Sequence, residues 1–336
     1  MQQQLSPQAA IMHVVAGYWL SRAVYLAARL KLADAVGERA TLAALAAATG
    51  TRPEALRRLM RALTSHGYFR EAEGGTFVHT PLSEALRSGG PGSMRAIAEA
   101  ELGHDHYQSW GKVESCLFEP GTAFERVYGM PIWHYYADHP ETQALFGEAM
   151  SNLTAIANAG VLASYRFAPF KTAVDVGGGH GSFLAAVLDA HPDASGVLFD
   201  VAEVIDNAAK DAFVAGKRNR IRTVSGDFFR EVPGGADLYL LKFILHDWDE
   251  ERAAAILINI RKAIAPKGRL IIVEIVLPSG NKPHVGPLID LNMMVMTGGI
   301  ERTEAQYGQL LARAGFRPER LVATKSPFSV IEASPV

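Results

Sequence analysis

The fold is decided by residues 173–181, which read Ala-Val-Asp-Val-Gly-Gly-Gly-His-Gly. An apolar run ends there at Asp175, a glycine cluster follows, and residues 182–188 have the apolar spacing of a helix. This order predicts a strand, a tight turn and a helix. Because glycine has no Cβ, such a turn lets backbone N–H groups approach a ligand closely. The glycines that alternate through the turn are Gly177, Gly179 and Gly181.

A second apolar run ends at Asp200, about 20 residues after the glycines, where a nucleotide-binding sheet places the carboxylate that holds a ribose diol. A dehydrogenase fingerprint requires a third glycine at the position that Ser182 occupies here. A pattern that fails at that position, with an acid before it, resembles the S-adenosylmethionine (SAM) methyltransferases. A strand–helix turn without any ligand is the plainer alternative.

Composition indicates an ordinary globular protein and argues against several functions. Of the 336 residues 49% are apolar and 20% charged, and the formal net charge of −2 argues against a chain built chiefly to bind nucleic acid. The one cysteine, Cys116, excludes an internal disulfide framework, and no zinc-type spacing is present, so we expect no metal. Residues 1–7 lack a basic secretory region and residues 14–32 carry basic side chains, so we expect a cytoplasmic protein without a membrane span.

The chain start has the pattern of a winged helix: helix, turn, helix and hairpin. The predicted helices are 7–32, 41–50 and 52–63, and the predicted strands are 67–71 and 76–80. The third helix carries Arg52, Arg57, Arg58 and Arg61, as a DNA-reading helix would. Because this charge is local and no basic tail accompanies it, we favour a solvated face of a packing module. The first helix has a broad apolar face, which needs a cover from its own domain or from a second subunit.

A helical, aromatic-rich segment follows over residues 93–165. Phe146 and Met150 lie four positions apart in it and so share one helix face, which is either helix core or the wall of a substrate site.

From residue 166 the pattern changes to short apolar runs alternating with helical segments, which predicts a parallel sheet with helices on both faces. The predicted strands are 172–176, 196–200, 221–225, 236–243 and 268–276. The predicted helices are 182–190, 204–215, 250–265 and 303–314. Two later strands, 320–324 and 329–333, would add an antiparallel strand at the sheet edge.

Ligands of an open parallel sheet bind beyond the carboxyl ends of its strands, so the residues that follow each strand form the candidate site. Gly226, Asp227 and Phe228 follow the third strand, where a carboxylate beside an aromatic ring suits the amino group and ring of adenine. Lys242 ends the fourth strand, where it either pairs with a carboxylate, such as that of SAM, or extends to solvent. Glu274 ends the fifth strand.

His246 follows the fourth strand and is the candidate general base. An unperturbed imidazole has a pKa near 6.5, so we expect it to be mostly the free base at neutral pH. A phenol has a pKa near 10, so its hydroxyl is a poor nucleophile until a base takes the proton. Glu274 and Glu301 are the candidate acceptors that would orient the other ring nitrogen.

Four motifs, in this order, resemble the small-molecule O-methyltransferases of the caffeate and hydroxyindole type, whose bacterial members often modify aromatic natural products. They are Asp-Val-Gly-Gly-Gly-x-Gly at 175–181, Gly-Asp-Phe-Phe at 226–229, Leu-x-x-x-Leu-His-Asp-Trp at 241–248 and Gly-Gly-x-Glu-Arg-Thr at 298–303. The resemblance covers almost the whole chain. It implies an α/β fold: a Rossmann-like class I methyltransferase sheet, mostly parallel with an antiparallel edge strand, after an α-helical winged-helix dimerisation domain.

The resemblance also implies roles and domain bounds. Residues 1–92 would form the dimerisation domain of a homodimer, 93–165 a helical cap on the substrate pocket, and 166–336 the SAM-binding catalytic domain. The predicted cofactor-binding residues are Asp175, Gly177, Gly179, Asp200, Gly226, Asp227, Phe228 and Lys242. The predicted acceptor pocket consists of Phe146, Met150, Asn292, Met293 and Met296. Where plant members often carry a histidine, this chain has Leu153, which argues against a phenylpropanoid acceptor.

We therefore predict methyl transfer from SAM to the hydroxyl of a small aromatic acceptor, with S-adenosylhomocysteine as the product and no metal. His246 would be the base, with Glu274 and Glu301 beside it. An NAD-dependent dehydrogenase and a winged-helix ligand-binding regulator are the alternatives, and within the family nitrogen or carbon methylation is another. No nucleic acid or membrane partner is expected.

Overall fold

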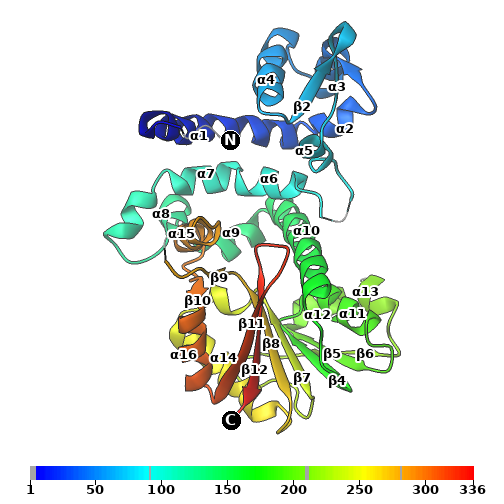
Figure 1. The fold of residues 1–336 in the computed structure, drawn as a ribbon, viewed down its shortest axis with the longest axis vertical. Coiled ribbons are helices and arrows are strands. Elements are labelled where there is room, and N and C mark those ends of the chain that lie inside the picture. The colour runs from blue at the N-terminus through cyan, green and yellow to red at the C-terminus, as the bar shows by residue number, and fades with distance from the viewer. Residues whose placement is uncertain (1–4, 91, 209–211, 281) are drawn as a thin grey trace. The chain divides into compact units, whose positions relative to one another are not determined.

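The structure, a computed structural model, describes residues 5–90, 92–208, 212–280 and 282–336. It has two units, Met1–Gly111 with Met130–Leu153, and Lys112–Gly129 with Thr154–Val336. Helix α10 (Pro140–Ser164) belongs to both, because the boundary falls within it (Figure 1).

The first unit begins with the winged-helix arrangement that the sequence predicts. Helix α1 (Pro7–Arg29) starts after Ser6, whose hydroxyl accepts a hydrogen bond from the Ala9 N–H. Gly50 ends the third helix in the left-handed conformation, with φ at 64°. The three strands pair antiparallel in the order β1-β3-β2. The elements after α1 are α2 (Leu32–Val36), β1 (Ala40–Thr41), α3 (Leu42–Thr49), α4 (Pro53–Ser65), β2 (Phe69–Ala72), β3 (Thr76–His79) and α5 (Pro81–Glu84).

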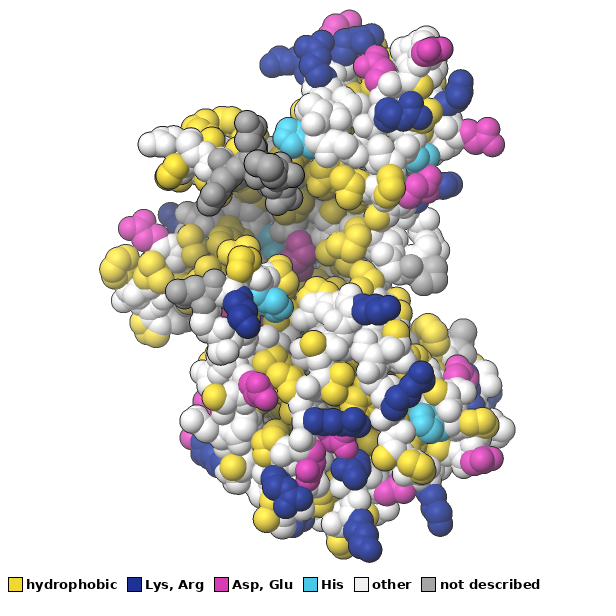
Figure 2. Space-filling view, viewed as in Figure 1, with side chains coloured by type: hydrophobic (Ala, Val, Ile, Leu, Met, Phe, Trp, Pro, Cys, Tyr) yellow, Lys and Arg dark blue, Asp and Glu magenta, His cyan; other side chains and the backbone are white. Residues whose placement is uncertain are grey.

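Helix α4 is amphipathic. Leu56, Met60 and Leu63 follow its helical period into a buried core. Figure 2 shows basic side chains gathered over this helix. The four arginines singled out from the sequence, Arg52, Arg57, Arg58 and Arg61, are exposed. Exposure is what a solvated face requires, and a DNA-reading face would require it too.

Helix α1 leaves large apolar side chains exposed (Figure 2). Val14 is 77% exposed and Trp19 is 61% exposed. The other members of this face are Ile11, Met12, Val15 and Tyr18. Soluble chains rarely leave so contiguous an apolar surface in water, so this face fits the sequence-based expectation of a surface that needs a cover.

The remaining helices of the first unit are α6 (Arg95–Glu101), α7 (His104–Trp110), α9 (Ile132–Asp138) and the first part of α10. Buried Arg95 joins α6 to α10 through an ion pair with Glu148 at 2.5 Å. Phe146 stacks in an aromatic cluster, with its ring centroid 4.9 Å from that of Tyr136. Met150 packs against a small buried group of alanines, so both residues have core contacts within this unit.

A seven-stranded sheet organises the second unit (Figure 1). Its order is β11-β12-β8-β7-β4-β5-β6, and the five strands from β8 to β6 run parallel. β12 pairs antiparallel with β8, and β11 antiparallel with β12, which confirms the predicted late edge hairpin. The strands are β4 (Thr172–Val176), β5 (Ser195–Asp200), β6 (Ile221–Ser225), β7 (Leu238–Lys242), β8 (Arg269–Glu274), β11 (Phe316–Ala323) and β12 (Ser329–Pro335).

Helices cover both faces of the sheet, as Figure 1 shows. Residues such as Val174 and Val197 share one buried core with α14 and α16. The opposite face receives α11, since a Cβ on Gly196 would lie 2.8 Å from Leu184. Strands buried on both faces need apolar interiors, and β4, β5, β7 and β8 have them, whereas the edge strand β6 carries Arg222 and Thr223. The helices are α11 (Ser182–Asp189), α12 (Ala202–Ala208), α13 (Ala212–Ala215), α14 (Glu250–Ala263) and α16 (Glu304–Arg313).

Two helices of the second unit differ from the sequence prediction, and the predicted helix 7–32 of the first unit is α1 and α2. The predicted helix 204–215 is α12 and α13, and residues 209–211 between them lie outside the described residues. Helix α15 (Gly286–Met296) was not predicted, because it is apolar around most of its circumference and shows no amphipathic period. A short parallel pair, β9 (Val276–Leu277) with β10 (Arg302–Thr303), connects the end of β8 to the segment before α16. Among the described residues, no helix is both long and apolar enough to span a bilayer.

Candidate active site

The candidate site lies at the carboxyl ends of β4 to β8, beside the point where the strand order reverses. β4 is flanked by β5 on one side and β7 on the other, so the chain leaves the sheet centre in both directions. In open α/β sheets ligands bind in the crevice at such a point.

The glycine turn after β4 has the conformation that only glycine adopts without strain. Gly177, Gly179 and Gly181 have φ values of 70°, 58° and 77°. A Cβ on Gly177 would lie 2.5 Å from the Ile244 side chain, so the turn is also sterically closed to larger residues. The N–H groups of Gly177 and Gly178 donate to the Phe199 carbonyl, which ties the turn to the end of β5.

Asp200 braces this turn. Its Oδ2 accepts from the Gly179 N–H at 2.9 Å, and its Oδ1 accepts from the Val201 N–H at 2.8 Å. Burial raises the pKa of the carboxyl, and these two hydrogen bonds oppose that rise. Each carboxylate oxygen keeps a second lone pair, so the group can still accept from ribose hydroxyls.

Asp227 and Phe228 have structural contacts as well as the predicted ligand roles. Oδ1 of Asp227 accepts from the Phe229 N–H at 2.8 Å and so fixes the turn. The Phe228 ring stands edge-on to Trp248, at 6.1 Å between centroids. Gly226 is required here, because a Cβ would lie 2.6 Å from the Phe199 ring. Asp227 is exposed, and its Oδ2 lies 3.7 Å from Nε of the exposed Arg230.

Asp175, which is buried, and Lys242, which is half-buried, influence each other electrostatically. The Asp175 side chain is 1% exposed, and its Oδ2 has no hydrogen-bond partner among the described residues. Burial raises the pKa of Asp175 to about 7, and the charge of Lys242 opposes the rise. Burial lowers the pKa of Lys242 to about 8, opposed by Asp175 and Glu274, and its Nζ donates to Thr154 Oγ1 at 3.0 Å. A half-buried cation at the end of a strand fits a ligand that carries a carboxylate, such as SAM.

His246 lies in the 3-10 turn η3 (Leu245–Asp247), which directly follows β7. Its Nδ1 is 2.9 Å from Oε1 of Glu301 and 3.9 Å from Oε2 of Glu274, and both glutamates are buried. Its Nε2 is 3.7 Å from Oδ1 of Asp247. The Nδ1–H donates to Glu301, so Nε2 is the nitrogen that can take a proton from a substrate.

Glu274 has a different role from Glu301. Its Oε1 accepts from the N–H groups of Ile244 and Leu245, each at 2.9 Å. Both N–H groups lie where β7 gives way to η3, after Phe243 in the left-handed region with φ at 59°. Glu301 is therefore the hydrogen-bonded orienter of the imidazole, and Glu274 supports the backbone that carries it.

The protonation state of His246 differs from the sequence-based expectation. Burial opposes the charged ring, but Glu274, the hydrogen bond to Glu301 and the charge of Asp247 outweigh it and raise the pKa of His246 to about 10. Burial likewise raises the pKa of Glu274 to about 7, against the charge of His246. The expectation of a mostly free base at neutral pH was wrong, because the sequence does not show how closely three carboxylates surround the ring.

Ligand atoms of His246, Glu274 and Glu301 lie within 4.8 Å of one another, so by donor type they could also hold a metal ion. The Nδ1–Glu301 hydrogen bond already uses one of these atoms as a donor. We therefore interpret the group as a base with its carboxylates.

Helix α15 brings predicted pocket residues to the same place. Asp290 on this helix accepts from the Glu301 N–H at 2.9 Å, and Met293 lies 2.7 Å from the position of a Cβ on Gly299. Met293 and Met296 are buried, and Asn292 is half-buried. Phe146 and Met150 belong to the first unit, and their place in an acceptor pocket stays a prediction.

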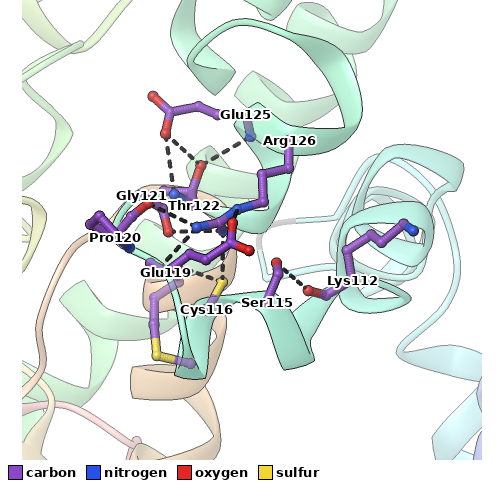
Figure 3. Close-up of polar contacts among 10 residues, drawn as sticks. Lys112, Ser115, Cys116, Glu119, Pro120, Gly121, Thr122, Glu125 and Arg126 are labelled. Carbon is purple, nitrogen blue, oxygen red and sulfur yellow. Dashed lines mark hydrogen bonds and ion pairs between the residues drawn. The ribbon is translucent and has the colours of Figure 1, made fainter.

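A polar cluster stiffens the segment on which α15 packs. Thr122 and Glu125 form a capping box at the start of α8 (Ala123–Tyr128), as Figure 3 shows. The Arg126 guanidinium donates to the carbonyls of Pro120 and Gly121 and lies 3.7 Å from the Cys116 sulfur. Cys116 belongs to the 3-10 turn η2 (Val113–Leu117), and both η2 and α8 contact α15.

Sequence reasoning missed two residues of this site. Thr154, which accepts from Lys242, carries no motif. Arg302 follows Glu301 and is fully buried against the turn that carries His246. Arginine is ordinarily exposed, so nothing in the sequence indicates this burial.

The comparisons with known proteins all indicate the same family. A family model described as the O-methyltransferase domain matches residues 110–317, and one described as the O-methyltransferase dimerisation domain matches residues 12–89. A phenazine O-methyltransferase from Lysobacter antibioticus is 41% identical, covering 97% of this chain and 96% of that one.

A crystal structure of a methyltransferase of calicheamicin biosynthesis, in its S-adenosylhomocysteine-bound form, superposes with a TM-score of 0.88 at 35% identity and covers 99% of this chain and 100% of that one. An 8-amino-8-demethylriboflavin N,N-dimethyltransferase from Streptomyces davaonensis is 37% identical, covering 87% of this chain and 85% of that one. Among the alternatives that the sequence left open, these relatives select the methyltransferase.

Proposed function

The chain belongs to the SAM-dependent O-methyltransferases, and from this premise we propose that His246 takes the proton of a phenolic hydroxyl as that oxygen receives the methyl group. SAM, when bound, supplies a methyl group on a cationic sulfonium. The observation that carries the proposal is the 2.9 Å hydrogen bond from His246 Nδ1 to buried Glu301, which leaves Nε2 as the proton acceptor.

The residues proposed to hold SAM follow the order of the strands. Asp200 accepts from ribose hydroxyls, Asp227 and Phe228 receive the adenine, and Lys242 pairs with the carboxylate. The glycines of the turn, with Asp175 behind them and Gly226 after β6, leave the backbone open to the ligand. The turn at Gly177 supports this role, because any other residue would be strained there and its side chain would have no room.

Proton transfer from the phenol to His246 is favoured because the two groups have similar pKa values. It is opposed because the His246 ring is already protonated in the resting enzyme. With a pKa of about 10, His246 is close to an ordinary phenol, so transfer from the hydroxyl to the neutral imidazole is nearly thermoneutral. At neutral pH the ring must first lose its own proton. Turnover should therefore rise with pH, and a cation bound beside the ring would lower the pKa of His246 and increase the reactive fraction.

The proposed acceptor is a small planar aromatic molecule with a hydroxyl group, of the natural-product class. The phenazine relative supports a polycyclic acceptor, and Leu153 argues against the phenylpropanoid class. Residues 93–165 would cap the pocket, and the residues proposed to line it are Phe146, Met150, Asn292, Met293 and Met296. Residues 1–92 would pair two copies through the uncovered apolar face of α1, and residues 166–336 would form the catalytic domain.

Methylation of nitrogen is the second candidate, because one relative is named as an N,N-dimethyltransferase. An aromatic amine needs no strong base to become a nucleophile, so the buried pair of His246 and Glu301 favours oxygen.

The experiment is methyl transfer to a panel of hydroxylated and aminated phenazines, naphthoates and indoles, by wild type and by His246→Gln. We expect hydroxyl acceptors to be used, and His246→Gln to lower kcat by about 10²–10⁴-fold near pH 10, where the wild-type ring is largely neutral. The dissociation constant for SAM, measured by calorimetry, should stay within about twofold. Wild-type turnover in the variant, or exclusive use of amines, would remove the proposal.

A further inference from the structure

Arg302 is a fully buried cation whose contacts are mostly with backbone oxygens. Its side chain is 0% exposed. Nη1 donates to the Leu245 carbonyl at 2.8 Å and to the Ile300 carbonyl at 3.3 Å, and Nη2 donates to the Trp248 carbonyl at 2.7 Å. Nε donates to Oε1 of Glu250 at 2.6 Å.

These carbonyls belong to the two segments that must meet at the proposed base. Leu245 precedes His246 and Trp248 ends the turn that carries it. Ile300 precedes Glu301, the orienter of the imidazole. One planar guanidinium therefore spans both segments at a point next to the reacting side chain on each of them.

Backbone contacts also join the segment that carries His246 to the segment that carries Glu301. The Ile300 N–H donates to the His246 carbonyl at 2.8 Å. Gly299 has no room for a side chain, because its Cβ would lie 2.4 Å from that carbonyl oxygen. The backbone positions of His246 and Glu301 are thus fixed by a continuous set of hydrogen bonds, to which buried Arg302 contributes three donors to carbonyls.

We propose that Arg302 is a positioning residue for methyl transfer, whose guanidinium fixes the backbone turn of His246 against that of Glu301 and so sets the hydrogen bond between the two side chains. This inference rests on the proposed function of His246. Arg302 contacts the backbone on either side of His246 and not its Nε2, so it acts through His246.

Arginine is suited to this task and lysine is not. A guanidinium has five donors in a rigid plane, so it can bond carbonyls on two segments and a carboxylate at the same time. A lysine at position 302 keeps the charge but offers one flexible ammonium. Arg302→Lys therefore tests the geometry with little change in the electrostatics of the site.

The chain offers a matched pair of milder variants at the start of α14. Glu250 anchors Arg302 from the half-exposed side, and Glu251, its neighbour, pairs instead with Arg313 at the surface. Glu250→Gln should loosen Arg302, whereas Glu251→Gln removes an equal charge from the same helix turn without touching the site.

The test is a set of double mutants, since an effect that passes through His246 must vanish when His246 is absent. Arg302→Lys, Glu250→Gln and Glu251→Gln are made in wild type and in His246→Ala. Radiolabelled methyl transfer gives kcat and KM for each full-length protein, calorimetry gives the SAM dissociation constant, and circular dichroism reports folding.

We expect Arg302→Lys to lower kcat by about 10- to 100-fold in wild type, because small misplacements of catalytic groups cost about that much. SAM affinity should change by less than about twofold. In the His246→Ala background the same substitution should change kcat by less than about twofold. Glu250→Gln should lower kcat by a smaller factor that also vanishes without His246, and Glu251→Gln should leave kcat unchanged.

The acidic limb of the pH–rate profile gives a readout that a purely structural role would not move. The groups facing His246 are Glu274, Glu301 and Asp247, and the bond to Glu301 raises the pKa of the ring. If Arg302→Lys loosens that bond, the acidic limb moves to lower pH.

Equal losses in the two backgrounds, or an unchanged kcat, would overturn the inference while leaving His246 as base. Full activity of His246→Ala would overturn both, so the two failures are distinguishable. If Arg302→Lys does not fold, the comparison of Glu250→Gln with Glu251→Gln decides. A loss of kcat that occurs only in Glu250→Gln, and only when His246 is present, supports the inference. Equal kcat in the two variants overturns it.

Discussion

Replacing Glu301 by glutamine should move the pH dependence of methyl transfer. Glutamine keeps an oxygen that can accept the hydrogen bond from His246 Nδ1 but removes the negative charge beside it. The bond is 2.9 Å long and buried, so the ring should keep its position while its charged form loses one of the carboxylates that stabilise it, with Glu274 and Asp247 still in place.

The size of the effect follows from the geometry. Two unit charges about 4 Å apart interact by about 4 kcal/mol at an effective dielectric constant of about 20, which is enough to bring a pKa from about 10 to near 7. The raised pKa of about 10 belongs to wild type. At pH 7 about one imidazole in a thousand is then neutral in wild type, and about half would be neutral in Glu301→Gln.

The assay is kcat/KM for the acceptor between pH 6 and pH 11, together with an NMR titration of the His246 ring in the free enzyme. We expect the acidic limb to move from about pH 10 toward pH 7, and the plateau rate to fall by on the order of 10-fold because the base is weaker. Two acceptors of different acidity separate the limb of His246 from that of the phenol. Glu304→Gln, an exposed glutamate on α16, is the matched control. An identical limb and NMR midpoint in wild type and Glu301→Gln would refute the reasoning.

Further outcomes are expected elsewhere in the molecule. Lys242→Met should weaken SAM binding by about 10- to 100-fold in calorimetry, since a charge-assisted hydrogen bond to the ligand is worth about 1.5–3 kcal/mol; unchanged affinity would remove Lys242 from the site. The folded-state pKa of His246 lies above its unfolded value, so the stability that it adds is full below about pH 6.5 and is lost as pH rises through about 10; urea unfolding of wild type and His246→Gln should converge over that range, and a constant difference would contradict the pKa shift. Val14→Glu, on the uncovered face of α1, should convert a dimer to a monomer in sedimentation experiments, and a persistent dimer would place the interface elsewhere. Dialysis against a chelator should leave turnover unchanged, and activity restored only by added metal would assign His246, Glu274 and Glu301 to an ion.

The sequence predicts the parts of this fold that depend on local pattern. Apolar runs that end at Asp175, Asp200 and Glu274 locate strands β4, β5 and β8, because a strand buried on both faces needs a continuous apolar run. The glycine cluster locates the turn because only glycine accepts its φ values. Helix α15 escaped prediction because apolar residues around its circumference leave no period to detect.

The site divides in the same way. His246 and both glutamates were found, because each follows a strand or belongs to a motif. The different roles of the two glutamates were not predicted, because they depend on which carboxylate, Glu301 or Glu274, lies 2.9 Å from the His246 ring. Arg302 and the raised pKa of His246 are likewise consequences of distances between segments about fifty residues apart, which no local pattern records.

The central claim is that His246 removes the proton of the acceptor hydroxyl. The most direct measurement is the ratio of wild-type to His246→Gln kcat at pH 7 for a series of acceptors whose hydroxyls range from ordinary phenols to ones already ionised at that pH. The account predicts that the ratio is largest for phenols with a pKa near 10 and falls toward one as the hydroxyl becomes acidic enough to ionise unaided. A ratio that is the same for every acceptor would contradict it.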